Sequence, residues 1–198
     1  MILCFSRMPG FGSLGCGFGT QGFASTSITF FLEPAAATKP TGRSFRPAVV
    51  LSNAPRSVGI TTNDTVIEHI AADPERLWGL ASLRVDRWAD ERDQQLAGLD
   101  AALDHPNMIG VKIAHAHQHF RMDDPDYYGI YEVAANHDAP VYLHTGPSPF
   151  PGTNQDAPYT DPAFLEEAIQ QHPDTKFILG HLGHDFINKA EGALETCL

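Results

Sequence analysis

A repeating unit is the feature that most constrains what this chain can fold into. Proline stands just ahead of short apolar runs at Pro74, Pro106, Pro140 and Pro173, at spacings of 32, 34 and 33 residues. An earlier apolar run, "AVVLS", follows Pro47. Apolar strands that recur at this period, with helical patterns between them, are typical of βα units on one parallel sheet.

The segments between the apolar runs carry the helical patterns. In "DERDQQLAGLDAALDHP", Leu96, Leu99 and Leu103 fall on one stripe of a helix. The pairs Asp124-Pro125 and Asp161-Pro162 combine a good N-cap residue with proline at the first helical position. Each pair predicts the start of a helix.

The number of units sets the fold class. Five βα units are clear, and the segment ahead of them could supply a sixth. A closed (β/α)8 barrel needs about 250 residues. We therefore predict a TIM-barrel-like α/β fold that is incomplete, and a doubly wound open sheet is the alternative that fits the length. The predicted strands form one parallel sheet in sequence order near 48–52, 76–82, 108–114, 140–144 and 176–181.

Residues 1–46 differ from the rest of the chain. They are rich in Gly and Phe and contain one acidic residue, Glu33. A secretory signal with "SITFFL" as its apolar core is one interpretation, but the core is short and Arg7 is the only early basic residue. We favour an atypical leader with one strand near 28–32, followed by a partial barrel domain over 47–198.

Charge and cysteine content limit the partners. The chain has 24 acidic and 13 basic residues, a formal net charge of −11. This charge disfavours nucleic acid and anionic membranes, because phosphate contacts need clustered Lys and Arg. Cys4, Cys16 and Cys197 lie near the two ends without ligand-like spacing. We expect a small-molecule substrate and a reducing, cytoplasmic location.

Polar residues stand at the C-terminal ends of three successive predicted strands: Lys112, His144 and His181. Val111 and Ile113 on the first of these strands, and Val141 and Leu143 on the second, would face the helices, which leaves Lys112 and His144 on the opposite face of the sheet. A long Gly/Pro-rich loop follows at residues 145–160. Because α/β proteins place their sites at this end of the strands, we predict the functional site there.

The stretch "KIAHAHQHF" attracts a zinc interpretation, because His115, His117 and His119 alternate. However, all three share the helix-facing parity, opposite Lys112. We predict that the strand ends near Ala114 and that the histidines enter a loop that is solvated or borders the substrate. Direct metal ligation by two or more of them is the alternative.

The motifs "GVKI", "PVYLHTG" and "FILGHLGHD", in this order and spacing, resemble the amidohydrolase-related metal-dependent hydrolases. The branch of closest resemblance includes aminocarboxymuconate-semialdehyde decarboxylase. The resemblance runs from about Pro47 to Asn188. It implies a distorted (β/α)8 barrel in which the predicted strands are the second to the sixth.

The resemblance also implies roles for individual residues. His144 corresponds to the metal ligand of the fifth strand, and His181 to a ligand or acid/base group beside metal-bound water. Lys112 stands where relatives carry a lysine that is either carboxylated to bridge two metals or free to bind substrate. Two further candidates rest on their positions in the sequence rather than on the resemblance. Asp185 follows His181 and would orient it, bind substrate or cap a helix, and Arg84 follows a predicted strand and would meet a substrate carboxylate or form a surface ion pair. The implied cofactor is a divalent metal, zinc or else manganese.

Two departures from the family pattern bear on activity. Residues 1–46 contain no histidine, so the His-x-His pair of the family's first strand is missing, and the late aspartate ligand would fall beyond Leu198. We therefore expect an impaired metal-dependent hydrolase or decarboxylase of a small carboxylated substrate. The alternative is a non-catalytic partial chain that self-associates as a homo-oligomer through open sheet edges. A third interpretation, a cupin-like metal strand, conflicts with the parallel βα rhythm.

Overall fold

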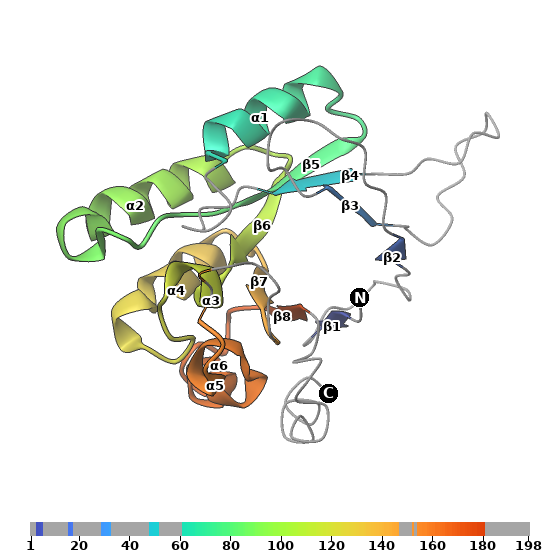
Figure 1. Ribbon diagram of the computed structural model, residues 1–198. Coiled ribbons are helices and arrows are strands. Elements are labelled where there is room, and N and C mark those ends of the chain that lie inside the picture. Colours follow the sequence, from blue (N-terminus) through green and yellow to red (C-terminus); the bar gives the residue numbers. More distant parts are fainter. Residues whose placement is uncertain are drawn as a thin grey trace.

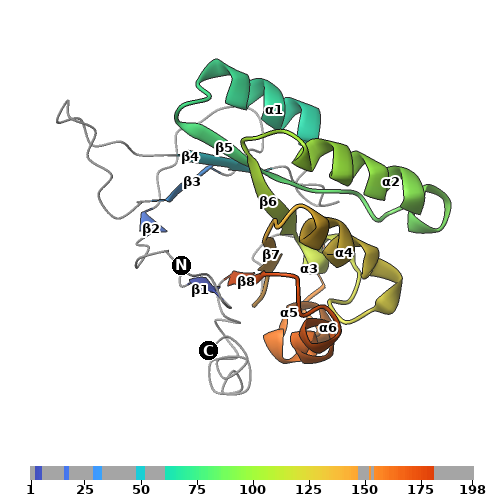
Figure 2. The ribbon, with the colours of Figure 1, turned by 180° about the vertical axis from the view of Figure 1, so that it is seen from behind.

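The computed structural model describes residues 61–146, 152 and 154–180 in full and the strand segments 3–5, 16–17, 29–32 and 48–51. Eight strands form one sheet in the order β1-β8-β7-β6-β5-β4-β3-β2. In Figures 1 and 2 the strands follow an arc, with α1, α2 and α4 along its outer side. The strands are β1 (Leu3–Phe5), β2 (Cys16–Gly17), β3 (Thr29–Leu32), β4 (Ala48–Leu51), β5 (Leu77–Ala81), β6 (Met108–Ile113), β7 (Val141–His144) and β8 (Phe177–Gly180).

Strands β4 to β8 pair in chain order, and every one of these pairings is parallel. The predicted parallel sheet is thereby confirmed. In the part of the chain that the structure describes, five parallel strands alternate with helices, where a closed barrel has eight. The fold is therefore α/β, TIM-barrel-like and incomplete, as the repeat predicted.

The three remaining strands pair antiparallel. The strand predicted near 28–32 is present as β3, which pairs with β4. Strand β2 pairs with β3, and β1 pairs with β8. Consequently β1 and β2 are the two edges of the sheet.

The helices fill the segments between the parallel strands. They are α1 (Asn63–Ala72), α2 (Trp88–Leu103), α3 (His115–Gln118), α4 (Gly129–Asn136), α5 (Ala157–Thr160) and α6 (Glu166–Gln171), with 3-10 turns η1 (Pro125–Tyr127) and η2 (Pro162–Leu165). Over the described part of the chain, none of these helices has the length and apolar character needed to cross a bilayer.

The two predicted aspartate caps are present, with one difference. The Asp124 carboxylate accepts from the Asp126 N–H at 3.1 Å, and the Asp161 carboxylate accepts from the Ala163 N–H at 3.0 Å. These residues cap η1 and η2, which then lead into α4 and α6. The Asp-Pro pairs thus begin tighter turns before the helices, because proline at the first position suits a 3-10 turn as well as an α-helix.

The hydrophobic core lies between the sheet and the helices. Val111, Ile113, Val141 and Leu143 are fully buried on the helix-facing side of the central strands. Gly79 of β5 faces the same side, since a Cβ atom there would lie 2.6 Å from Val66 of α1 and would also contact Met108. The predicted leucine stripe of α2 belongs to this core, with Leu99 and Leu103 buried and Leu96 packed against them.

A bulge in β6 sets which side chains face the interior. Gly79 pairs with Met108 and Ala81 pairs with Val111, so two steps along β5 match three along β6. The extra residue lets both Met108 and Val111 face the helices. Gly110 lies within this bulge, where a Cβ atom would be 2.8 Å from the Pro140 carbonyl oxygen and 2.9 Å from Leu80.

Replacement of Gly110 by alanine should destabilise the fold. The added methyl meets backbone that cannot rotate away, so we expect a loss of about 1–3 kcal/mol in the free energy of unfolding. Urea denaturation measures it. Gly98→Ala is the matched control, because nothing lies within 4 Å of the added atom and alanine is the better helix former by roughly 0.5–1 kcal/mol. Equal effects of the two substitutions would contradict the close packing at the bulge.

Candidate functional site

The C-terminal ends of β6 and β7 carry the candidate site. Lys112 pairs with Tyr142, and His144 pairs with Gly180 on β8. Since Val141 and Leu143 lie in the helix-facing core, alternation places Tyr142 and His144 on the interior face. The predicted parity of Lys112 and His144 is confirmed by this packing.

Lys112 is a buried amine, with 6% of its surface exposed. Its Nζ lies 4.2 Å from the centre of the Tyr142 ring and donates to the Ile113 carbonyl oxygen at 3.4 Å. Among the described residues, no carboxylate forms an ion pair with it. Burial therefore lowers the pKa of Lys112 to about 7, so that the charged and neutral amine coexist at neutral pH.

Glycine at position 180 makes room for this arrangement. A Cβ atom at Gly180 would lie 2.5 Å from the Tyr142 hydroxyl oxygen and 2.7 Å from its ring. The tyrosine thus occupies the space that a side chain on β8 would fill. Its ring face lies against the Lys112 amine and partly offsets the loss of water around the charge.

The chain after β7 holds His144 at the end of the strand. The Thr145 hydroxyl donates to the Gly180 carbonyl oxygen at 2.5 Å, which ties the end of β7 to β8. Gly146 then adopts a φ of 80°, a conformation that favours glycine, and its N–H donates to the Thr160 carbonyl oxygen at 2.7 Å. The sequence "HTG" therefore holds the backbone at the end of β7 against β8 and the end of α5.

The environment of the three alternating histidines differs from the prediction. The strand ends at Ile113, as expected, but α3 follows directly. His115 and His117 are 0% and 4% exposed, so the prediction of a solvated loop is wrong for them, whereas His119 is exposed. The reason is the change of period: once the backbone turns helical, alternation along a strand no longer decides the direction of a side chain.

His115 packs into the core beside the site. Its ring lies 4.6 Å from the Phe120 ring. Neither ring nitrogen has a hydrogen-bond partner among the described residues. Burial, with the nearby Lys112 charge, lowers the pKa of His115 to about 3, so the ring is neutral at physiological pH.

His117 lies against His144. The two ring centroids are 5.4 Å apart and the ring planes are perpendicular. Burial and the Lys112 and His119 charges lower the pKa of His117 to about 4, which also keeps this ring neutral. The sequence prediction missed this contact, although the alternation of histidines directly after a site strand was the signal that pointed to it.

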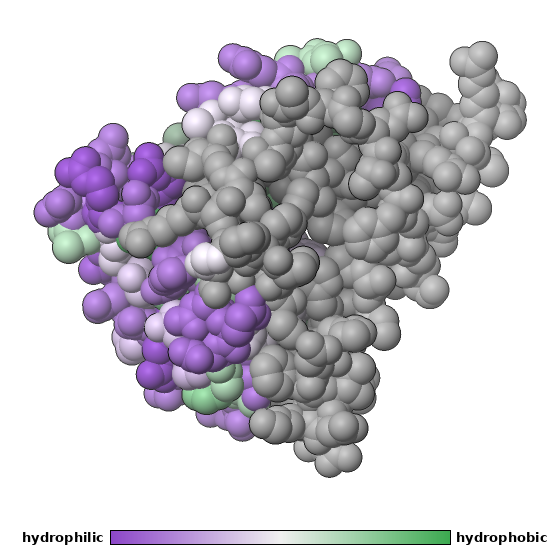
Figure 3. Space-filling model, in the orientation of Figure 1, coloured by the Kyte–Doolittle hydropathy of each residue, from purple (hydrophilic) through white to green (hydrophobic). Residues whose placement is uncertain are grey.

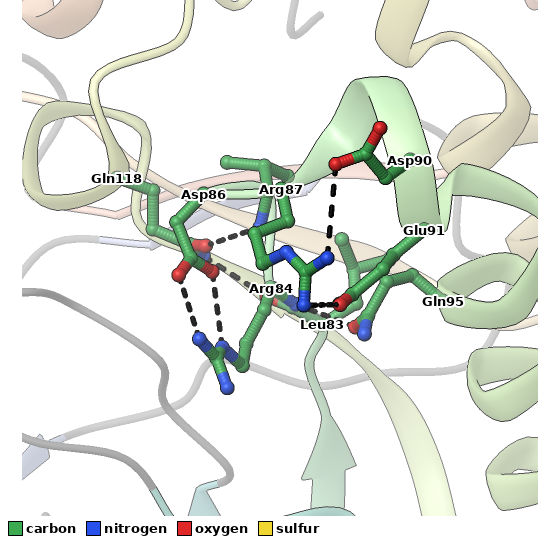
Figure 4. Close-up of polar contacts among 9 residues, drawn as sticks. Leu83, Arg84, Asp86, Arg87, Asp90, Glu91, Gln95 and Gln118 are labelled. Carbon is green, nitrogen blue, oxygen red and sulfur yellow. Dashed lines mark hydrogen bonds and ion pairs between the residues drawn. The ribbon is translucent and has the colours of Figure 1, made fainter.

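Hydrogen bonds fix α3 on several sides. The Gln118 amide donates to the Leu83 carbonyl oxygen at 3.1 Å (Figure 4). It also accepts from the Val85 N–H at 3.2 Å. The Asn154 N–H donates to the Ala116 carbonyl oxygen at 2.8 Å. These contacts join α3 to the loop after β5 and to the segment before α5.

Arg84 belongs to that loop but is engaged on the surface. Its guanidinium forms two hydrogen bonds with the Asp86 carboxylate, at 3.0 and 2.6 Å (Figure 4). The Asp86 hydrogen bond raises the pKa of Arg84 further. Of the two predicted roles, the surface ion pair is the one observed.

Two histidine rings lie together at the end of β7 in the described part of the chain. His117 is neutral because its pKa is lowered to about 4, and its ring lies against the ring of His144. Neutral imidazole is the form in which histidine binds metal. Over residues 61–146, 152 and 154–180, no group of three or more His, Cys, Asp or Glu side chains could hold a metal ion. His181 and Asp185 lie outside the described residues, so further donors from them are predictions.

Stability should rise with pH because of Lys112. The unfolded lysine has a pKa of about 10.5 and the folded one about 7, so the unfolded state binds the extra proton between these values. Stability therefore increases by up to about 1.4 kcal/mol per pH unit from pH 7 upward. Lys112→Met should remove this slope and raise stability at pH 7. Urea denaturation at pH 7, 8 and 9 measures both effects.

Lys176→Met is the matched control for that experiment. Lys176 forms an ion pair with Asp138 and is partly exposed, so its loss should leave the slope unchanged. If the slope persists in Lys112→Met, groups other than this amine cause it.

Comparison with known proteins relates the chain to a family. A family profile described as amidohydrolase matches residues 28–193. No protein of curated function matches the sequence. An uncharacterised TIM-barrel protein of Bordetella bronchiseptica is similar in structure, with a TM-score of 0.62 and 19% identity over 75% of this chain and 50% of that protein.

Two decarboxylases are similar at lower scores. For 2,6-dihydroxybenzoate decarboxylase of Rhizobium the TM-score is 0.47 and the identity 22%, over 63% of this chain and 44% of that one. For dihydroxybenzoic acid decarboxylase of a Polaromonas species, solved with manganese and an inhibitor, the TM-score is 0.47 and the identity 22%, over 63% and 43%. The chain spans about half the length of the solved proteins it matches or less. Because the family match covers most of its sequence, the chain belongs to the amidohydrolase family.

Proposed function

We propose that this chain is a metal-dependent hydrolase or decarboxylase that acts on a small carboxylated substrate. The observation that carries the proposal is the interior position of Lys112 and His144 at the C-terminal ends of two neighbouring strands. In βα barrels this end of the sheet is where catalytic groups gather. Membership of the amidohydrolase family supports the reaction class.

The proposed cofactor is a divalent metal held by His144 together with His181, zinc or else manganese. When bound, it would polarise a substrate oxygen or lower the pKa of a water molecule. His181 would accept or return a proton next to the substrate, and Asp185 would orient His181 through a hydrogen bond. His144 suits its role because it is half-buried at the strand end, where the Thr145 hydrogen bond holds the backbone.

Lys112 would bind the carboxylate of the substrate. Its amine is buried and pairs with no carboxylate in the described part of the chain. A buried charge without a counter-ion is costly, and a bound carboxylate would supply that counter-ion. Tyr142 would then lie beside the ion pair and help to exclude water.

The acidic outer surface is consistent with a small-molecule partner rather than a nucleic acid. Hydrophilic side chains gather over α2 and its neighbours in Figure 3. The exposed acidic residues of this helix and its C-cap are Asp90, Asp93, Asp100 and Asp104. Phosphate backbones are repelled by such a surface. We further propose a cytoplasmic location and a division into an atypical leader, 1–46, and a partial barrel domain, 47–198.

The second candidate is a non-catalytic chain that self-associates. It is favoured by the small number of donors, since the described residues bring two imidazoles together rather than three or four. Association would proceed through the sheet edges at β1 and β2 and would give a homo-oligomer. Metal binding distinguishes this candidate from the enzyme.

Loss of His144 should abolish metal binding. The purified chain is loaded with zinc or manganese, dialysed and analysed for bound metal. We expect His144→Ala to weaken binding about 100-fold or more, because removal of a ligand costs more than the 10–100-fold typical of an outer contact. His137→Ala is the control, since His137 bonds Asp100 on the surface. A chain that binds neither metal would refute the enzyme proposal and favour the second candidate.

Binding of small carboxylates should weaken as pH rises. Lys112 is charged below its pKa of about 7 and neutral above it, so the affinity for benzoate should fall up to about tenfold per pH unit above neutrality. Titration calorimetry at pH 6, 7 and 8 measures the change. Lys112→Gln should bind benzoate weakly at every pH, while Lys176→Gln should behave like the parent chain. Affinity that is independent of pH in the parent chain would contradict the role of Lys112.

A further inference from the structure

We infer that His117 is a ligand of the metal held by His144, so that the centre is built between α3 and the end of β7. The inference rests on the proposed metal dependence and adds to it a donor from the "HAHQH" segment. It replaces our sequence-based expectation that these histidines lie away from the metal.

The arrangement of the two rings fits a shared ion. Their centroids are 5.4 Å apart and their planes are perpendicular. Two imidazoles bound to one zinc ion, with Zn–N distances of about 2.0–2.1 Å and tetrahedral angles, hold their ring centroids about 5 Å apart. The observed centroid separation is close to that value, and this agreement is the geometric basis of the inference.

The backbone that carries His117 is held before any metal binds. Gln118 connects α3 to Leu83 and Val85, and Asn154 bonds the carbonyl oxygen of Ala116. On the other side, Thr145 ties the end of β7 to β8. Both histidines are thus presented from fixed elements, which lowers the entropy lost when a metal binds.

The structure separates His117 from the other two histidines of the motif. His115 packs on Phe120 in the core. His119 has a φ of 61° at the end of α3, and its Nε2 contacts the Gly152 carbonyl oxygen at 2.7 Å. Of these three, His117 is the residue whose ring contact with His144 is observed. His115 and His119 can therefore serve as controls when His117 is replaced.

Matched substitutions test the assignment. His115→Gln, His117→Gln and His119→Gln are compared with the parent chain and with His144→Ala, using Co²⁺ absorption and zinc competition to measure affinity. We expect His117→Gln to weaken binding about 100-fold, close to the effect of His144→Ala. His115→Gln and His119→Gln should change the affinity less than about threefold, because substitutions away from a functional contact usually have small effects.

A variant that gains an absorption band provides a second test, which does not depend on the loss of metal binding. In His117→Cys, thiolate coordination of Co²⁺ adds a sulfur-to-cobalt charge-transfer band in the near ultraviolet. His119→Cys should not produce this band, and the parent chain corrects for Cys4, Cys16 and Cys197. Circular dichroism and thermal melting check that each variant is folded, and the band in His117→Cys decides the question if His117→Gln does not fold.

The experiment gives different outcomes for the proposed metal-dependent function and for the assignment of His117 as a ligand. If His144→Ala loses the metal while His117→Gln and His117→Cys behave like the parent chain and the His119 control, the inference about His117 is overturned and the proposed function stands. If the parent chain binds neither Co²⁺ nor zinc, both fail. Equal losses in His117→Gln and His144→Ala, with the new band in His117→Cys, support a shared ion.

Discussion

The alternation of side chains along β6 and β7 decides which residues stabilise the fold and which face the interior. Val111, Ile113, Val141 and Leu143 fill the space beneath the helices and are fully buried. The residues that alternate with them along the two strands then point to the other face, and these are Lys112, Tyr142 and His144. Because the apolar set must remain buried, the polar set has no freedom to turn away from the interior.

The same constraint makes Lys112 an energetically costly residue. An amine that cannot reach solvent and has no carboxylate partner in the described structure loses the water that stabilises its charge. Contact with the Tyr142 ring compensates in part, and that contact exists because position 180 has no side chain. One glycine on β8 therefore supports a lysine two strands away.

More of the fold than of the candidate site could be predicted from the sequence. Proline ahead of each apolar run predicted the parallel strands and their order, and local alternation predicted the interior faces of Lys112 and His144. The position of His117 could not be predicted from alternation, because only Ala114 separates the end of β6 from α3, and the helix changes the period. The Gln118 contacts that hold α3 join residues 33 and 35 positions apart, which no local pattern contains. The roles of His181 and Asp185 stay predictions.

The bulge in β6 limits how this chain can be compared with its relatives. The three residues of β5 from Gly79 to Ala81 match the four residues of β6 from Met108 to Val111. Deletion of one residue there would restore even pairing but would turn every later side chain of the strand to the other face. Lys112 would then enter the space beneath the helices. A gap placed within β6 in a sequence alignment would shift the strand in the same way. It would match positions that face the helices in one protein with positions that face the interior in another.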